Sequence, residues 1–272
     1  EERLFEALGD LFTIGTGANI PLHISHIKLT GKNMWGKADE VLARIEQQRS
    51  TGLTITQDQY LYTAGSAGLC RLIPECAHEI GRDAFAQRIA SPFHRQRMKN
   101  RMLTMLRSSG YEDYSHVAIA YYNHDRTLNG LRIPEAARQK LESDSLDAQM
   151  ELLIKMESHG GGMVIFHNVT EADVRTFVRH PATMIASHSE VRSREVGVPH
   201  PRGYGNAARA IGRYARDLEL ITLEEAVRRM TSLPATTFKL AGRGKVAPEY
   251  AADIVIFDAA TVRDNATFED PH

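Results

Sequence analysis

Three histidines stand directly after strand-like runs of the sequence, where an imidazole can hold a metal ion or move a proton. They are His26, His167 and His188. In α/β barrels the catalytic groups lie at the carboxyl ends of the strands, so these positions favour one shared site. Neutral imidazoles suit Zn²⁺, which lowers the pKa of a bound water to about 7. The three histidines permit a hydrolytic zinc site but do not require one, because no closely spaced two-ligand motif occurs.

The other histidines give a weaker signal. His23 precedes His26 by three residues, and an odd separation along a regular strand points two side chains to opposite faces. An isolated histidine in a helical or inserted segment is expected to be solvated or structural. This group comprises His78, His94, His116, His124, His159 and His180.

A second set of residues is suited to bind an anion. Lys28 follows the first strand-end histidine by two residues and so shares its face. The loop 199–205 is stiff at its prolines and permissive at its glycines. It is either a rigid turn or a platform that holds His200 or Arg202 against an anionic substrate. Ser66 lacks the spacing of a nucleophile elbow, and no phosphate-loop or dinucleotide motif occurs, so acyl transfer to serine and nucleotide binding are not expected.

The composition excludes several classes of protein. The 272 residues include 33 Lys+Arg and 34 Asp+Glu, which gives a net charge of −1 and no basic field that would attract nucleic acid. The apolar runs are only a few residues long, whereas a membrane helix needs about 20. Cys70 and Cys76 do not form a Cys-x-x-Cys motif, and we expect them to be reduced thiols. The sequence therefore predicts a soluble, cytoplasmic protein with no membrane or nucleic-acid partner.

The elements expected around these residues alternate between helix and strand. Residues 1–15 and 35–48 have the apolar spacing of helices, while residues 19–28 and 53–58 lead into or form short strands. This order predicts a parallel sheet covered by helices.

The middle of the chain interrupts that alternation. Residues 67–160 contain mainly short charged helices, whereas a connection between a strand and a helix normally takes about 2–6 residues. We therefore expect an inserted lid subdomain there. After it, strands are expected at 162–167, 182–187 and 250–258, a helix capped by Thr170, and helices at 207–217 and 223–231.

Several runs resemble a known family over most of the chain. They are HISHIK (23–28), DQYLYTAGS (58–66), MIASHSE (184–190), VPHPRGYGNAARAIGRYARD (198–217), LEEAVRRMTSLPA (223–235) and YAADIVIFD (250–258). Together they resemble the D-aminoacylase, or N-acyl-D-amino-acid deacylase, branch of the amidohydrolase superfamily. The resemblance implies a metal-dependent hydrolase of N-acyl amides on a distorted (β/α)₈ barrel with a small β-domain. In that family, zinc activates water and an aspartate on the last barrel strand acts as the base.

The resemblance assigns roles to individual residues. His26 matches a metal ligand on the sixth barrel strand. Lys28, Tyr60 and Ser66 match positions that hold the substrate carboxylate, for which an ammonium and two hydroxyls are suitable donors. The implied division of the chain is 1–66 for barrel strands and helices, 67–160 for the lid, 161–240 for the last barrel strands and helices, and 241–272 for part of the β-domain.

Two departures from the family pattern are expected to limit catalysis. The family's catalytic aspartate falls at His188, which brings no negative charge to a metal. The family's other metal ligands would lie upstream of Glu1, so we expect an incomplete α/β chain, a partial metal-dependent-hydrolase TIM barrel formed by the later strands. Exposed edges of such a sheet would favour self-association.

Three functions follow from these expectations. The first is zinc-dependent hydrolysis of N-acyl-D-amino acids, with His188 at the position of the base and Arg202 among the substrate-binding residues. The second is a non-catalytic relative that binds a carboxylate through the same residues. The third is hydrolysis of cyclic amides such as hydantoins or dihydroorotate.

Overall fold

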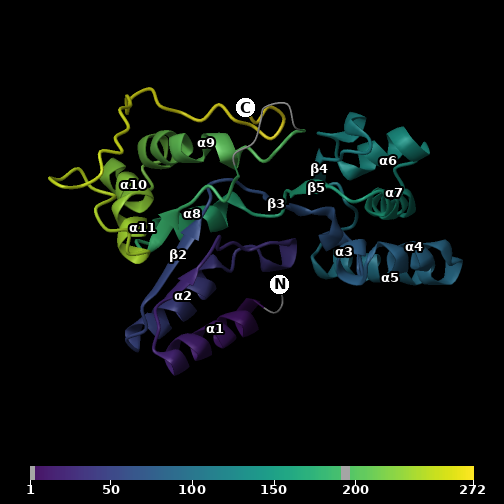
Figure 1. Ribbon diagram of the computed structural model, residues 1–272, viewed down its shortest axis with the longest axis horizontal. Coiled ribbons are helices and arrows are strands. Elements are labelled where there is room, and N and C mark those ends of the chain that lie inside the picture. Colours follow the sequence, from purple (N-terminus) through teal and green to yellow (C-terminus); the bar gives the residue numbers. More distant parts are fainter. Residues whose placement is uncertain (1–3, 191–196) are drawn as a thin grey trace.

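Two three-stranded sheets, one parallel and one antiparallel, organise the chain (Figure 1). The structure is a computed structural model that describes residues 4–190 and 197–272. The first three residues of the predicted N-terminal helix lie outside the described residues. Within the described residues no helix is both long and apolar enough to cross a membrane.

The parallel sheet is built from the segments that alternate in the sequence. Its strands are β1 (Leu22–Ile24), β2 (Ile55–Gln59) and β6 (Thr183–Ile185), with β2 in the centre. The helices α1 (Leu4–Ala18), α2 (Ala38–Ser50) and α8 (Glu171–Arg179) belong to this part of the chain. Apolar side chains from α2, β2 and α8 are buried against one another and hold α2 and α8 on the sheet. The most deeply buried of them are Val41, Ile45, Ile55 and Phe177. The predicted parallel arrangement is confirmed.

The antiparallel sheet is formed by one strand inside the range 67–160, which was predicted to be an insertion, and by two strands at the borders of that range. Its order is β3 (Gly65–Gly68), β5 (Met163–Phe166) and β4 (Val117–Tyr121). Five helices gather around it at one end of the molecule (Figure 1). They are α3 (Ala77–Ile80), α4 (Arg82–Ala90), α5 (Pro92–Ser108), α6 (Ile133–Leu141) and α7 (Leu146–Ser158).

The placement of β5 corrects one expectation. The sequence places residues 162–167 with the strands of the parallel sheet, but β5 pairs with β3 and β4 instead. The run Met163–Phe166 is apolar, as a strand buried on both faces is in either kind of sheet, so its composition does not indicate its partner. The strand β4 was not expected from the sequence at all.

Helices follow the parallel sheet up to residue 237. They are α9 (Arg202–Arg209), a π-helical segment η4 (Ala210–Asp217), α10 (Leu223–Met230) and α11 (Ser232–Thr237). Short 3₁₀ turns are η1 (Lys32–Met34), η2 (Leu69–Leu72) and η3 (Arg126–Leu128). The predicted cap of α8 is confirmed, because the Thr170 side chain accepts a hydrogen bond of 3.2 Å from the Asp173 N–H.

The strand expected at 250–258 does not form. These residues run as an extended, irregular tail (Figure 1), and Ile256 is 94% exposed. An extended segment becomes a strand only when a neighbour accepts and donates its backbone hydrogen bonds, and no described strand pairs with this one.

The two cysteines also differ from expectation. Cys70 and Cys76 are joined by a disulfide, so the prediction of reduced thiols is wrong for this structure. The turn of η2 and the bend at residues 74–75 bring the two Cα atoms to 5.5 Å, a separation that a disulfide spans. Sequence spacing alone does not reveal that bend.

Candidate active site

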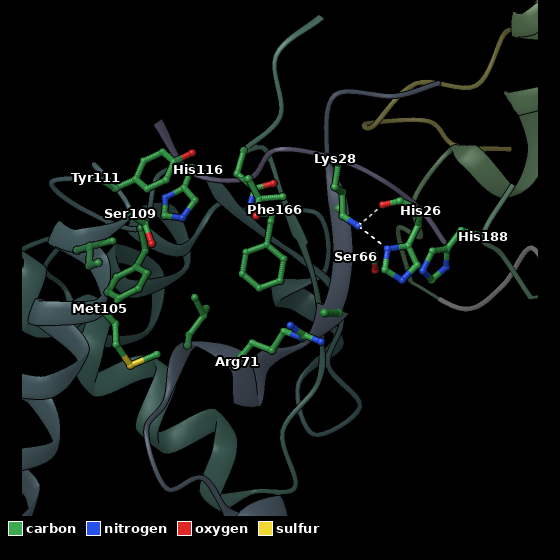
Figure 2. A pocket seen from close by; sticks show the side chains of 18 of the residues that line it. His26, Lys28, Ser66, Arg71, Met105, Ser109, Tyr111, His116, Phe166 and His188 are labelled. Atoms are coloured by element: carbon green, nitrogen blue, oxygen red, sulfur yellow. Dashed lines mark hydrogen bonds between the residues drawn. The ribbon is translucent and has the colours of Figure 1, made fainter. Parts of the chain in front are cut away.

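A pocket of about 560 Å³ is lined by residues from both sheets and their flanking loops (Figure 2). Loops that follow the parallel strands contribute His26, Tyr60 and His188, while Ser66 and Phe166 come from the antiparallel sheet. The carboxyl ends of parallel strands meet at one edge, which explains why residues far apart in the sequence converge there.

His26 and His188 lie together, as their positions after strands predicted. Their ring centroids are 4.7 Å apart. Both residues have a left-handed backbone, with φ of +45° and +48°, which is uncommon outside glycine. At His26 the Asp58 carboxylate stabilises this turn, because its Oδ1 accepts the His26 N–H at 2.6 Å. The other Asp58 oxygen lies 2.7 Å from His23 Nε2. His23 itself is not among the residues that line the pocket.

A cation donates to each of these two imidazoles. Lys28 Nζ lies 2.9 Å from His26 Nδ1, and Arg202 Nη2 lies 3.2 Å from His188 Nδ1. Lysine and arginine only donate, so each Nδ1 is an acceptor and the neutral ring carries its proton on Nε2. Partial burial, followed by the charge of Lys28, lowers the pKa of His26; partial burial, followed by Arg202, lowers the pKa of His188. Both rings are therefore neutral bases at neutral pH.

The same two cations flank Tyr60. Lys28 Nζ lies 5.6 Å and Arg202 Cζ 4.5 Å from the centroid of the Tyr60 ring. Tyr60 is 2% exposed, and its burial raises the pKa of the phenol to about 12 despite the nearby Arg202. Tyr60 thus stays a neutral hydroxyl between two positive charges.

The proline-rich loop holds Arg202 in place through His200. His200 Nδ1 accepts the Arg202 N–H at 3.1 Å, so Nε2 carries the proton and donates to the Ala64 carbonyl at 2.8 Å. Burial, together with Arg202, lowers the pKa of His200 to about 3. Of the two residues that the loop offers, Arg202 lines the pocket. His200 is outside that lining and holds the Arg202 backbone by a hydrogen bond.

Asn206 on α9 joins the loops that present Tyr60 and His188. Its Oδ1 accepts the Leu61 N–H at 2.8 Å, and its Nδ2 donates to the Ala186 carbonyl at 3.1 Å. The neighbouring Gly205 has no room for a side chain, since a Cβ there would lie 2.2 Å from the Tyr62 hydroxyl. These contacts explain the Gly-Asn pair in the middle of α9.

Two other histidines, His167 and His116, lie where the sequence did not predict them. His167 does not line the pocket; its N–H donates to the His116 carbonyl and its ring packs against Phe268. His116, expected to be structural, does line the pocket and stacks on Tyr111 with 3.7 Å between ring centroids. Burial lowers the pKa of His116 to about 4.

The far part of the pocket was not predicted. Figure 2 shows Met105, Ser109 and Tyr111 away from the two neighbouring histidines, with Phe166 between, whereas Arg71 lies below Phe166 and extends its guanidinium toward the histidines. These residues come from η2, α5 and the loop after α5, and the tertiary fold brings them together. No local motif marks them in the sequence.

The described residues supply two imidazoles for a metal and no complete metal centre. His26 and His188 have no third histidine, cysteine or carboxylate ligand atom grouped with them within 4.8 Å in the described part of the chain. Each ring also accepts a hydrogen bond from a cation, which disfavours a nearby metal. The donor set as arranged does not fit a zinc centre on its own.

Comparison with known proteins identifies the family. Residues 94–272 match the Amidohydrolase family. A D-aminoacylase from Alcaligenes xylosoxydans xylosoxydans is 31% identical over 270 residues, which make up 99% of this chain and 46% of that protein. An N-acyl-D-glutamate deacylase from the same organism is 29% identical over 265 residues, or 97% of this chain and 44% of that protein. This chain thus spans less than half the length of these curated relatives.

Solved structures give the same result. A D-aminoacylase structure, described as having a binuclear metal centre, aligns with a TM-score of 0.74 and 31% identity over 99% of this chain and 47% of its own. The N-acyl-D-glutamate deacylase of Bordetella bronchiseptica, solved with zinc and a phosphonate mimic of the tetrahedral intermediate, aligns with a TM-score of 0.74 and 26% identity. It covers 98% of this chain and 46% of its own. The resemblance drawn from the sequence motifs is confirmed: the chain belongs to the amidohydrolase family and is similar to its D-aminoacylases.

Proposed function

We propose that this pocket binds the carboxylate of a small N-acyl amino acid, in a hydrolase that cleaves the amide of N-acyl-D-amino acids. The observation that carries the proposal is the position of Lys28 and Arg202 beside the Tyr60 ring, in a pocket that Ser66 also lines. Two cations and two hydroxyls can together satisfy the lone pairs of one carboxylate. The names of the relatives support N-acyl-D-amino acids as the substrate class.

Carboxylate binding would also change the state of the two histidines. Lys28 and Arg202 donate to the Nδ1 atoms of His26 and His188. A carboxylate that attracts the same donors competes with these imidazoles and releases their lone pairs. His188, neutral at neutral pH, then takes the position of the family's base and can accept a proton.

Zn²⁺ is the metal we include in this proposal, with His26 as one ligand. The zinc-bound structure of an N-acyl-D-glutamate deacylase supports that choice. Because the described residues do not complete a metal centre, the proposal assigns no step of the reaction to the metal through them.

The finer architecture is part of the same proposal. The parallel sheet β1-β2-β6 would represent later strands of a barrel, the unit around β3-β5-β4 would act as a lid over the substrate, and residues 241–272 would belong to a β-domain. We place the protein in the cytoplasm.

The outer strands β1 and β6 each have one edge that pairs with no other strand of the described sheet, and these edges would allow self-association.

A binding panel tests the substrate class. Isothermal titration of the 272-residue chain should show tighter binding of N-acetyl-D-leucine and N-acetyl-D-glutamate than of their L-enantiomers, and weaker binding of hydantoin and dihydroorotate. Tighter binding of the cyclic amides would reject the linear N-acyl substrate and favour the cyclic-amide alternative.

One observation favours a second function, carboxylate binding without hydrolysis. The position of the base is occupied by His188, which is hydrogen-bonded to a cation and adds no negative charge to a metal site. Restoring aspartate by His188→Asp in the zinc-supplemented chain, or in a longer form of the protein, separates the two. Equal hydrolysis of N-acetyl-D-amino acids by both forms supports the enzyme with a histidine base, whereas hydrolysis only by the aspartate form supports the binding relative.

A further inference from the structure

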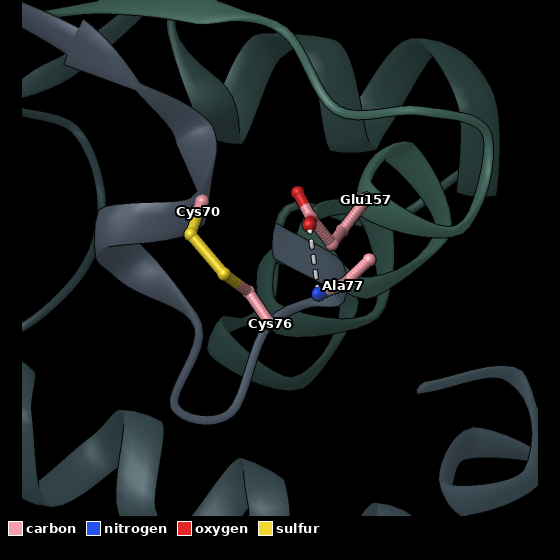
Figure 3. Close-up of a disulfide and its surroundings, with 4 residues drawn as sticks. All are labelled: Cys70, Cys76, Ala77 and Glu157. Carbon is pink, nitrogen blue, oxygen red and sulfur yellow. Dashed lines mark hydrogen bonds between the residues drawn. A yellow bond between two sulfur atoms is a disulfide. The ribbon is translucent and has the colours of Figure 1, made fainter. Parts of the chain in front are cut away.

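A second cluster of reactive side chains lies in the unit around the antiparallel sheet, and the proposed reaction does not use it. It consists of Cys70 in η2, Cys76 at the start of α3 and Glu157 near the end of α7 (Figure 3). The two sulfurs and a carboxylate oxygen of Glu157 all lie within 4.8 Å of one another. In the described residues, no other three side chains of the metal-binding types form such a group.

The cluster is enclosed by the protein. Cys76 is fully buried and Glu157 is 5% exposed, while Cys70 is partly accessible. Glu157 Oε1 accepts the Ala77 N–H at 3.1 Å, which orients the carboxylate toward the sulfurs (Figure 3). Burial of a carboxylate is costly, and His78 and Arg82 offset part of that cost at Glu157. A cation held between this carboxylate and two thiolates would offset more of it.

We propose that Cys70, Cys76 and Glu157 form a binding site for a thiophilic divalent cation, with Zn²⁺ as the best fit, once the disulfide is reduced. Two thiolates and one carboxylate supply three ligands of the types that zinc takes, and a water completes a four-coordinate shell. The disulfide and the metal are thus alternative occupants of one site.

The chemistry balances with a dithiol as the reductant. One thiolate of the dithiol attacks the accessible Cys70 sulfur, and Cys76 leaves as a thiolate. The second thiol of the reductant then closes its own disulfide and releases Cys70, so the protein gains two electrons and two protons. Binding of Zn²⁺ to the two cysteines releases those two protons.

The segment that carries the two cysteines also contributes residues to the active-site pocket. Arg71 and Leu72, which follow Cys70, line the pocket. Either a disulfide or a metal holds the segment 70–76 in place, and the metal also ties it to α7 through Glu157. Reduced protein without metal would have neither constraint, so Arg71 would be held less firmly in the pocket lining.

Metal binding by the metal-depleted chain tests this site without reference to hydrolysis. The background variant is His26→Ala, so that zinc at the active-site histidines does not contribute. After reduction with a phosphine and its removal under argon, the chain should bind Zn²⁺ stoichiometrically in competition with a chromogenic chelator. Co²⁺ should give a thiolate-to-cobalt charge-transfer band. The unreduced chain should show neither signal.

Two variants keep the test decisive. Glu157→Gln retains an acceptor for the Ala77 N–H, so the fold is kept while the zinc affinity should fall by at least about 10-fold. Cys70→Ser with Cys76→Ser should abolish the cobalt band. If reduced chain with both cysteines binds no more zinc than the double serine variant, or if Glu157→Gln binds as tightly as the parent, the site is wrong.

Discussion

The guanidinium of Arg202 donates to Nδ1 of His188 at 3.2 Å, so a cation occupies the basic atom of the residue that we propose at the position of the base. The same guanidinium lies 4.5 Å from the Tyr60 ring centroid, inside the group that we assign to the substrate carboxylate. Recognition of the carboxylate and the basicity of His188 are therefore linked through one side chain.

Loss of either cation should weaken the binding of N-acyl amino acids. Arg202→Met and Lys28→Met each remove one charge-assisted hydrogen bond to the carboxylate, which is typically worth about 1.5–3 kcal/mol, or roughly 10-fold to 100-fold in affinity. Isothermal titration with N-acetyl-D-leucine measures the effect. The control is Arg107→Met, which removes an exposed arginine outside the pocket and should change nothing.

Replacement of Arg71 should change which amino acid is preferred. Arg71 is a further cation that lines the pocket besides Lys28 and Arg202, and it lies below Phe166 with its guanidinium extended toward the histidines (Figure 2). Arg71→Leu should weaken N-acetyl-D-glutamate several-fold while leaving N-acetyl-D-leucine unchanged or bound more tightly. Competition titrations with the two ligands check this, and an equal loss for both would assign Arg71 to the fold instead.

Asn206 should be needed for both stability and binding. Asn206→Ala leaves the Leu61 N–H and the Ala186 carbonyl without their partner, which should lower the free energy of unfolding by about 1–3 kcal/mol. Ligand affinity should fall as well, because Tyr60 and His188 lie on the two loops that Asn206 joins. Chemical denaturation and titration measure the two effects; undiminished affinity in a destabilised variant would limit Asn206 to a folding role.

Acid should destabilise the folded chain through His200. Burial and Arg202 lower its folded pKa to about 3 from an ordinary value of 6.5, so below about pH 6.5 the unfolded chain binds the proton that the folded chain rejects. Stability contributed by neutral His200 is thus complete above this pH and decreases as the pH falls. Between about pH 7 and about pH 5 the loss is about 2 kcal/mol.

Urea denaturation at the two pH values measures that loss. His200→Gln keeps a donor for the Ala64 carbonyl but does not titrate, so its stability should fall less over the same interval. A pH dependence identical to that of the parent chain would show that His200 is not the group responsible.

Local patterns in the sequence determined much of the fold and half of the site. Apolar spacing located α1 and α2, and strand ends located His26 and His188, because these features depend on periods of a few residues. The Pro-Arg-Gly run indicated that either His200 or Arg202 faces an anion, but only the contact of His200 with Ala64 distinguishes them.

What the sequence did not predict depends on distant partners. The strand β5 has the same composition whichever sheet it joins, and the run 250–258 forms no strand because no described strand pairs with it. The Cys70–Cys76 bond needs the turn at residues 74–75. Arg71 and His116 line the pocket only because the tertiary fold brings η2 and the start of β4 close to the loops of the parallel sheet.

The central claim is that the pocket recognises a carboxylate through Lys28, Tyr60, Ser66 and Arg202. The most direct test is isothermal titration of the 272-residue chain with N-acetyl-D-leucine and with its carboxamide, which differ only in that group. The account predicts saturable binding of the acid and at least about 10-fold weaker binding of the carboxamide, with the difference lost in Arg202→Met. Equal binding of the two ligands by the unaltered chain would contradict it.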